Sequence, residues 1–482
     1  MHTEDYIVDL HCHPNLKAFN SGHPKPVFTL WDKIIHPYTD SSFMRWVRRN
    51  SANVHKESQC DLTALAENQV RVINLSLYPM ERGFLHLRNV PKFLVGGNRT
   101  EMMLEHISGM ALKRITALRK QDNHYFANLE AEYEYVRNGQ GKCPDRDFSY
   151  EIVNNYRELQ AALKKPGNIA VIISIEGAHS FGSGTPVSLK MKEAELKEVM
   201  TDNLRKVKQW EYPPFTVNLA HHFWNQLCGH SSSFRRPISD LINQNKGKDK
   251  GFTDLGRHIM RELLSRENGK RILIDTKHMS VASRREYYDF LINYNYLNPN
   301  DKIPIICSHG GVNGYKDMAA SMLEKDNLKK SRNSLFHRWS INVSDEEIRI
   351  IHDSEGLIGF MMDKGMVGGG NHVKQIVTRL DLEQQRIEFC KLFWQNIFHA
   401  VKAVNKPTGW DIMALGTDYD GTISHMDPYE GAAKLPTFWN DLVHYLEETK
   451  LHKELWYDYQ PKELVKKLMY TNSMEFYRKY FI

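Results

Sequence analysis

The chain has 482 residues, of which 41% are hydrophobic and 11% aromatic, and it carries a formal net charge of +6. This length and apolar content exclude a disordered chain and allow either one large barrel with insertions or several ordinary domains. The charge is small for the length, and acidic and basic residues are interspersed, which argues against a nucleic-acid-binding surface.

Eight short apolar segments predict buried strands. In chain order they cover residues 6–10, 70–77, 170–175, 215–220, 271–275, 303–308, 356–361 and 412–416. Helical patterns lie between most of them, at 189–210, 253–264, 280–294, after the capping box at 344–347, at 382–404 and at 461–480. This alternation predicts a parallel α/β sheet, and eight strands are the number that closes a (β/α)8 TIM barrel. The alternative is an open doubly wound sheet, which would gather its ligands at one switch point.

Two connections are too long to be ordinary loops. Residues 14–66 and 78–169 must contain structure of their own. Both follow the carboxyl ends of strands, where barrel active sites form, so we expect them to build the wall of a pocket. We expect residues 1–482 to form a single barrel domain with these two insertions.

Two histidines surround Cys12 at the end of the first strand. Side chains alternate along a strand, so His11 and His13 point to the same side and can chelate a divalent metal. Other strand ends add further polar residues, namely Glu176, His221, His278, His309 and Asp418. Each of them alone is explained by an ordinary structural role. Together at one rim of a barrel they would be costly to bury without a shared ligand, so the set predicts a metal site.

Five of these residues are enough for two divalent metal ions. We expect His11 and His13 to hold one ion, His278 and His309 to hold the other, and Glu176 to bridge them. A hydroxide that bridges the two ions would be the nucleophile, because two cations lower the pKa of bound water.

The remaining strand-end residues fit supporting roles. Asp418 is expected to take the proton of the nucleophile and pass it to a leaving amine. His221 is expected to polarise the carbonyl or hold the oxyanion. His222 and His230 have no partner in phase and are expected to be structural. The chemistry that this set specifies is hydrolysis of an amide or a related bond.

Several motifs, in this order, resemble the membrane dipeptidase (renal dipeptidase) family, peptidase family M19, of the amidohydrolase superfamily. They are SIEGAHS (174–180), LAH (219–221), ILIDTKHMSV (272–281), PIICSH (304–309), NVSDE (342–346) and LGTDYDG (415–421). The resemblance implies a metal-dependent hydrolase barrel with two zinc ions that cleaves dipeptides. It also implies a bridging role for Glu176, metal binding by His278 and His309, substrate contact for His221 and proton transfer for Asp418.

Two of the chain's departures from the family pattern concern metal and substrate binding. The family usually has His-x-Asp at the first strand, where this chain has His11-Cys12-His13, which adds about one unit of positive charge. The family also has an arginine that reads the substrate carboxylate, just before the segment matching Asn342-Val343. Here Trp339-Ser340-Ile341 stands there, and Arg338 is the nearest candidate for substrate binding. Alternative functions are therefore hydrolysis of a lactone, cyclic amide or phosphoester, or binding without catalysis on the same barrel.

Composition also predicts the cellular setting. Six cysteines without CxxC spacing predict reduced, buried thiols. No apolar run reaches the roughly 20 residues of a membrane span, and the first residues lack the features of a secretory signal. We expect a cytoplasmic protein that acts on a small peptide-like substrate, without nucleic-acid partner or membrane span; a homodimer is left open.

Overall fold

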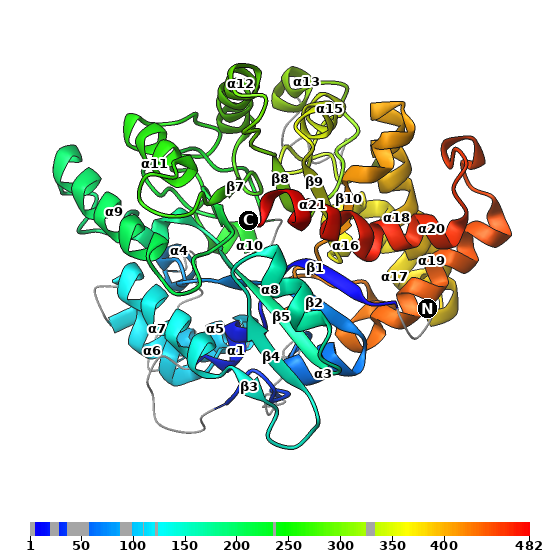
Figure 1. Ribbon diagram of the computed structural model, residues 1–482, viewed down its shortest axis with the longest axis horizontal. Helices are drawn as coiled ribbons and strands as arrows, with labels where there is room; N and C mark the ends of the chain where they lie inside the picture. The colour runs from blue at the N-terminus through cyan, green and yellow to red at the C-terminus, as the bar shows by residue number, and fades with distance from the viewer. Residues whose placement is uncertain are drawn as a thin grey trace.

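Eight parallel strands form the centre of the molecule (Figure 1). The computed structural model describes residues 5–19, 28–35, 57–86, 99–108, 110–120, 124–234, 238–323 and 333–482. The strands are β1 (Ile7–Cys12), β2 (Val70–Leu77), β5 (Asn168–Ile175), β6 (Thr216–Asn218), β7 (Leu273–Asp275), β8 (Ile306–Gly310), β9 (Leu357–Phe360) and β10 (Met413–Leu415), and they are hydrogen-bonded in this order. All eight predicted strands are present.

The sheet closes between its first and last strands. Cys12 and Tyr419 form a parallel bridge, and the His13 amide donates to the carbonyl of Tyr419 over 3.0 Å. The amide of Asp418 donates to the carbonyl of His11 over 2.9 Å. The predicted (β/α)8 TIM barrel is therefore confirmed, and the open doubly wound sheet was the wrong alternative.

Both faces of the barrel strands are covered. Every residue of β1 and β5 is buried, because one face packs inside the barrel and the other against helices. Figure 1 shows the ring of helices around the strands. The larger ones are α9 (Glu193–Lys208), α11 (Asp254–Leu264), α12 (Val281–Leu297), α15 (Asp345–Asp353), α18 (Leu382–Val404) and α19 (Leu435–Thr449). The predicted capping box is present, with Ser344 and Glu347 at the start of α15.

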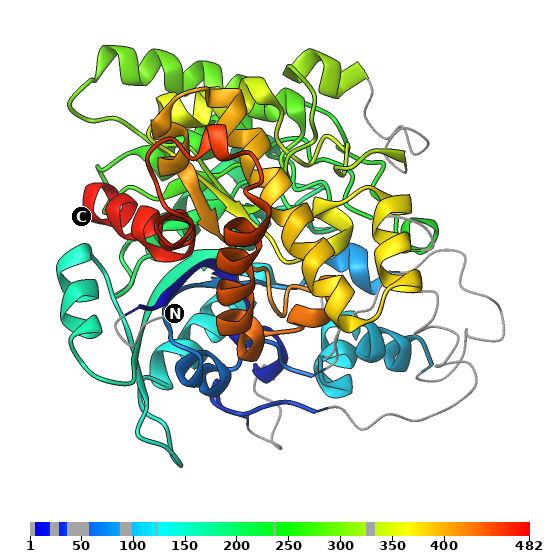
Figure 2. The ribbon, with the colours of Figure 1, turned by 90° about the vertical axis from the view of Figure 1, so that its right-hand side faces the viewer.

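Short helices follow several strands on the side where the strands end. They are α10 (Ile238–Leu241), α13 (Met318–Leu323), α16 (Lys364–Val367) and α17 (Gly370–Arg379). In Figure 2 the yellow helices α16 and α17 lie on one side of the strands, and the red carboxyl-terminal helix lies on the other.

The carboxyl-terminal segment packs at the beginning of the strands. The predicted helix over 461–480 consists of α20 (Pro461–Lys466), a π-helical segment (Lys467–Thr471) and α21 (Asn472–Tyr480). The Tyr470 ring lies 4.8 Å from the ring of Tyr6, which precedes β1. The Tyr477 hydroxyl donates to Asn74 Oδ1 of β2 over 2.7 Å. These contacts cover one end of the barrel and leave the opposite end for a site.

Both predicted insertions contain helices. Residues 14–66 include α1 (Pro14–Ala18) and α3 (Leu62–Glu67), while 20–27 and 36–56 lie outside the described residues. Residues 78–169 include α4 (Arg82–Leu85), α5 (Arg99–Ser108), α6 (Leu112–Lys120), α7 (Tyr125–Asn138), β3 (Gly141–Lys142), β4 (Ser149–Ile152) and α8 (Tyr156–Leu163), while 87–98, 109 and 121–123 lie outside them. Strand β4 pairs with the first half of β5, an extension of the sheet that sequence patterns did not predict.

The structure also bears on the cysteines and on membrane-spanning helices. All six cysteines are buried and none forms a disulfide, as predicted. Among the described residues, no helix combines the length and the apolar composition that crossing a bilayer requires.

Candidate metal centre

Four histidine rings meet in two pairs at the carboxyl ends of the strands. The Nε2 atoms of His11 and His13 lie 3.1 Å apart, and those of His278 and His309 lie 3.2 Å apart. These are the two pairs that strand alternation and strand order predict. The four side chains are buried, with exposed fractions of 5% or less.

Glu176 lies between the two pairs of histidines. Its Oε2 is 3.1 Å from His13 Nε2, and its Oε1 is 3.2 Å from His278 Nε2. The same Oε1 lies 3.4 Å from His11 Nε2 and 3.7 Å from His309 Nε2. One carboxylate thus faces both histidine pairs, which is the position that a bridging ligand needs.

The chemistry of this donor set fits divalent metal ions. Burial, reinforced by the neighbouring His221 charge, lowers the pKa of His278 to about 3, so its ring is neutral and can offer a lone pair. Burial likewise lowers the pKa of His11 and of His309. Neutral imidazoles beside a carboxylate are the ligands that zinc prefers. Glu176, His278 and His309 form one group that could hold an ion, and His11 and His13 form another together with Asp418.

Two buried carboxylates below the histidines hold the strand ends in place. Asp9 accepts hydrogen bonds from the His11 amide and from the amide and hydroxyl of Thr417. Asp275 Oδ1 accepts from the amides of Lys277 and Ser308. The backbone amides that precede or carry the ligands are therefore fixed from beneath, which orients the side chains above them.

Asp418 faces the first pair of histidines. Its Oδ1 is 3.7 Å from His13 Nε2 and 3.8 Å from His11 Nε2. Burial raises the pKa of this carboxyl well above its usual range, and the Glu176 charge raises it further. The residue has a φ of 59°, and His278 has a φ of 68°. Such left-handed backbone is uncommon outside glycine and is enriched at functional sites.

His221 lies on the other side of Glu176 and is held by a residue that the sequence did not single out. Its Nε2 is 3.4 Å from Glu176 Oε1, and its Nδ1 is 2.6 Å from Oε2 of Glu81. Burial lowers the pKa of His221, but the Glu176 and Glu81 carboxylates outweigh this effect and raise it to about 10. Glu81 belongs to the insertion 78–169, where no strand end marked it.

A cavity of about 380 Å³ opens above these residues. Its polar floor includes His13, Glu176, His221, His278, His309 and Asp418, together with two lysines, Lys277 and Lys364. Most of the remaining wall is apolar and comes from two groups of residues: Leu16, Met80, Phe84, Leu85, Leu104, Met110 and Ile115, and then Ile341, Met361, Met366, Val373 and Ile423. The first group comes from the two insertions, which therefore contribute to the wall of this pocket.

Comparison with known proteins gives the same family as the motifs. The sequence model described as membrane dipeptidase (peptidase family M19) matches residues 219–460, half of the chain. This chain belongs to peptidase family M19. It is therefore a metal-dependent hydrolase. No curated protein sequence matches the chain significantly.

A solved structure shares the fold of this M19 chain. A metallopeptidase from Rhodobacter sphaeroides, crystallised with a phosphinate mimic of the dipeptide L-Ala-D-Ala, matches with a TM-score of 0.50 and 12% identity, covering 98% of this chain and 99% of that one. The M19 dipeptidase AC matches with a TM-score of 0.49 and 12% identity, covering 91% and 96%. At 12% identity the likeness to the Rhodobacter sphaeroides structure shows the fold alone.

Arg338, the expected carboxylate-binding residue, does not line the cavity. Its guanidinium lies over the ring of Tyr315, 4.1 Å from the ring centre. Ile341 lines the cavity instead, directly before Asn342, where the family has its arginine. The backbone turns between these residues, so closeness in sequence did not bring Arg338 to the substrate side.

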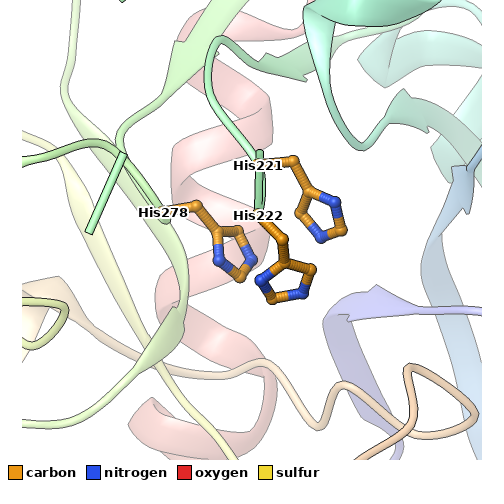
Figure 3. A group of neighbouring side chains, drawn as sticks. All are labelled: His221, His222 and His278. Carbon is orange, nitrogen blue, oxygen red and sulfur yellow. The ribbon is translucent and has the colours of Figure 1, made fainter. Parts of the chain in front are cut away.

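His222 lies at the cavity, whereas the sequence favoured a structural role. Its ring centre is 3.9 Å from that of His221 and 4.7 Å from that of His278, and Figure 3 shows the three rings together. These three histidines form another group that could hold a metal ion. His230 differs, because both of its ring nitrogens lie within hydrogen-bond distance of backbone carbonyls, those of Ser231 and Lys246.

Proposed function

We propose that this M19 chain is a dipeptidase that hydrolyses the amide bond of a small substrate with two divalent ions, zinc being the expected metal. The observation that carries the proposal is Glu176 between the pairs His11–His13 and His278–His309. The related Rhodobacter sphaeroides enzyme, which was crystallised with a dipeptide mimic, supports a dipeptide as the substrate.

The chemistry divides between the ions and the side chains around them. When bound, two divalent ions would lower the pKa of water and polarise the substrate carbonyl. Asp418, close to the ligands but outside the bridging set, would accept a proton and return it to the leaving amine. His221 would donate from Nε2 to the oxyanion, while Glu81 holds its Nδ1–H.

The cavity favours dipeptides with apolar side chains. Its volume of about 380 Å³ suits a small molecule, and its wall above the polar floor consists largely of aliphatic, Met and Phe side chains. Burying an apolar side chain there removes it from water, which contributes about 0.8 kcal/mol per buried CH₂. We therefore expect leucine- or phenylalanine-containing dipeptides to be better substrates than glycine-containing ones.

A substrate panel tests this function. The purified chain, supplied with zinc or manganese, is incubated with L,L and L,D dipeptides, lactones and phosphotriesters. The proposal predicts hydrolysis of apolar dipeptides with the highest kcat/KM. Turnover only of lactones or phosphotriesters would contradict it and support a different hydrolase of the superfamily. Bound metal without turnover of any member would instead support a binding protein.

A further inference from the structure

Lys277 places a buried amine in the polar floor of the cavity. Only 2% of the residue is exposed, and its Nζ has no hydrogen-bond partner among the described residues. The other lysine that lines the cavity, Lys364, forms an ion pair with Asp427. A buried amine that makes no hydrogen bond is costly, so its presence indicates a hydrogen-bond partner that arrives with a ligand.

The amine of Lys277 lies close to the proposed metal ligands. Lys277 directly precedes His278, and its backbone amide is fixed by Asp275 over 3.0 Å. Its Nζ lies beside Gly310, the residue after His309, at 3.9 Å from where a Cβ on that glycine would be. The charged end therefore lies next to the strand that carries a proposed metal ligand.

The chain has no arginine where the family recognises the substrate carboxylate. Ile341 lines the cavity at that place, and Arg338 lies over Tyr315. We propose that Lys277, in the segment after β7, takes over this role and binds the terminal carboxylate of the substrate. The inference rests on the proposed function, because it assumes a substrate that carries a free carboxylate beside the scissile amide.

Binding of the substrate carboxylate by Lys277 predicts a change in affinity of a definite size. A charge-assisted hydrogen bond in a buried site changes affinity by about 10- to 100-fold. Its loss should appear for substrates with a carboxylate and be absent for substrates without one. A purely structural role, as a counter-charge for Asp275 and Asp418, would instead affect all substrates alike.

Two substrates that differ only in charge separate these roles. L-Leucyl-L-leucine and L-leucyl-L-leucinamide are compared with wild type, Lys277→Met and Lys277→Arg, all loaded with zinc. Lys208→Met is the matched control, since Lys208 is also a buried lysine but lies away from the cavity, where its Nζ donates to the carbonyl of Ser265. We expect Lys277→Met to raise KM for the free acid by about 10- to 100-fold and to change KM for the amide by less than about threefold. Lys277→Arg and Lys208→Met should keep the preference for the acid.

An equal change of KM for both substrates in Lys277→Met, or none for either, would overturn the inference. If wild type cleaves neither substrate, the proposed function fails, and calorimetric titration with L-leucyl-L-leucine decides on Lys277 alone. Binding that weakens at least tenfold in Lys277→Met would support the carboxylate contact. Equal binding by both proteins, or no binding to wild type, would overturn it.

Discussion

Glu81 determines which nitrogen of His221 faces the cavity. The 2.6 Å contact between Glu81 Oε2 and His221 Nδ1 keeps the proton-bearing Nδ1 on the Glu81 side and leaves Nε2 on the side of Glu176. The same carboxylate accepts from the amides of His222 and Phe223 and so fixes the segment after β6. Burial opposes ionisation of Glu81, but the His221 charge outweighs it and lowers the pKa of Glu81 to about 2.

Glu81→Gln should therefore lower kcat. The amide keeps the shape but removes the charge that stabilises the protonated ring of His221, and we expect a loss of about 10- to 100-fold. Metal content should stay at the wild-type value, because Glu81 is not in the proposed ligand set. Glu134→Gln, on the half-exposed side chain of Glu134 in α7, is the control. Unchanged kcat in Glu81→Gln would remove the positioning role.

Asp418→Asn should lower turnover by about 10²- to 10⁴-fold, because an amide cannot carry the proton. Elemental analysis of the same preparation should give the wild-type metal content. Asp254→Asn, whose side chain is 85% exposed, should behave as wild type. Loss of metal in Asp418→Asn would instead identify Asp418 as a ligand.

For individual residues, the sequence pattern at the strand ends predicted which side chains lie together at the rim of the barrel. His11, His13, Glu176, His278 and His309 each lie at or just after the carboxyl end of a buried strand, and parallel strands bring these ends to one rim. Glu81 and Lys277 could not be predicted in the same way. Glu81 comes from a long insertion, and Lys277 is out of phase with His278, so only the folded backbone shows that both reach the cavity.

At the scale of elements, helices α12 and α15 are joined by a buried ion pair. Arg284 Nε lies 2.5 Å from Glu347 Oε1, and both residues are almost completely buried. Glu347 also accepts hydrogen bonds from the amide and hydroxyl of Ser344, which completes the capping box of α15. The start of α15 is therefore tied to α12, which follows Lys277 and His278 in the chain.

Glu347→Ala should destabilise the fold by about 3–5 kcal/mol, because it leaves the Arg284 charge buried without its partner. The adjacent Glu346→Ala is the control: Glu346 pairs with Arg285 over 3.2 Å at a partly exposed position, and its loss should cost about 1 kcal/mol. Urea unfolding followed by circular dichroism measures both. Equal effects of the two substitutions would contradict this account.

Helices and strands could be predicted where the sequence pattern that determines them is local. The helix predicted at 382–404 has those bounds in the structure, since its periodicity and cap are local. Strand β4 escaped prediction because its four residues gain their order from pairing with β5. The apolar pocket wall of the insertions likewise arises from tertiary packing, which no short pattern encodes.

At the scale of the whole molecule, the proposed ligands connect distant parts of the barrel. His11 and His13 lie on and just after β1, Glu176 follows β5, His278 follows β7 and His309 belongs to β8. An ion held by them would cross-link strands that are far apart in the sequence. Metal binding should therefore stabilise the fold as well as support catalysis.

Thermal unfolding should show this coupling. A chelator-treated sample should unfold at a lower temperature than the zinc-loaded one, and free zinc at 100 times Kd would stabilise the fold by about 2.7 kcal/mol per site. His309→Ala should reduce the difference, because the proposed second pair loses one ligand. Identical unfolding temperatures with and without metal would contradict a structural link through these residues.

The most direct measurement is the metal content of the purified chain. Zinc is added, excess ions are removed by gel filtration, and the ratio of metal to protein is determined by elemental analysis. Two histidine pairs that share Glu176 predict about two divalent ions per chain. A ratio at or below one would contradict the proposed centre.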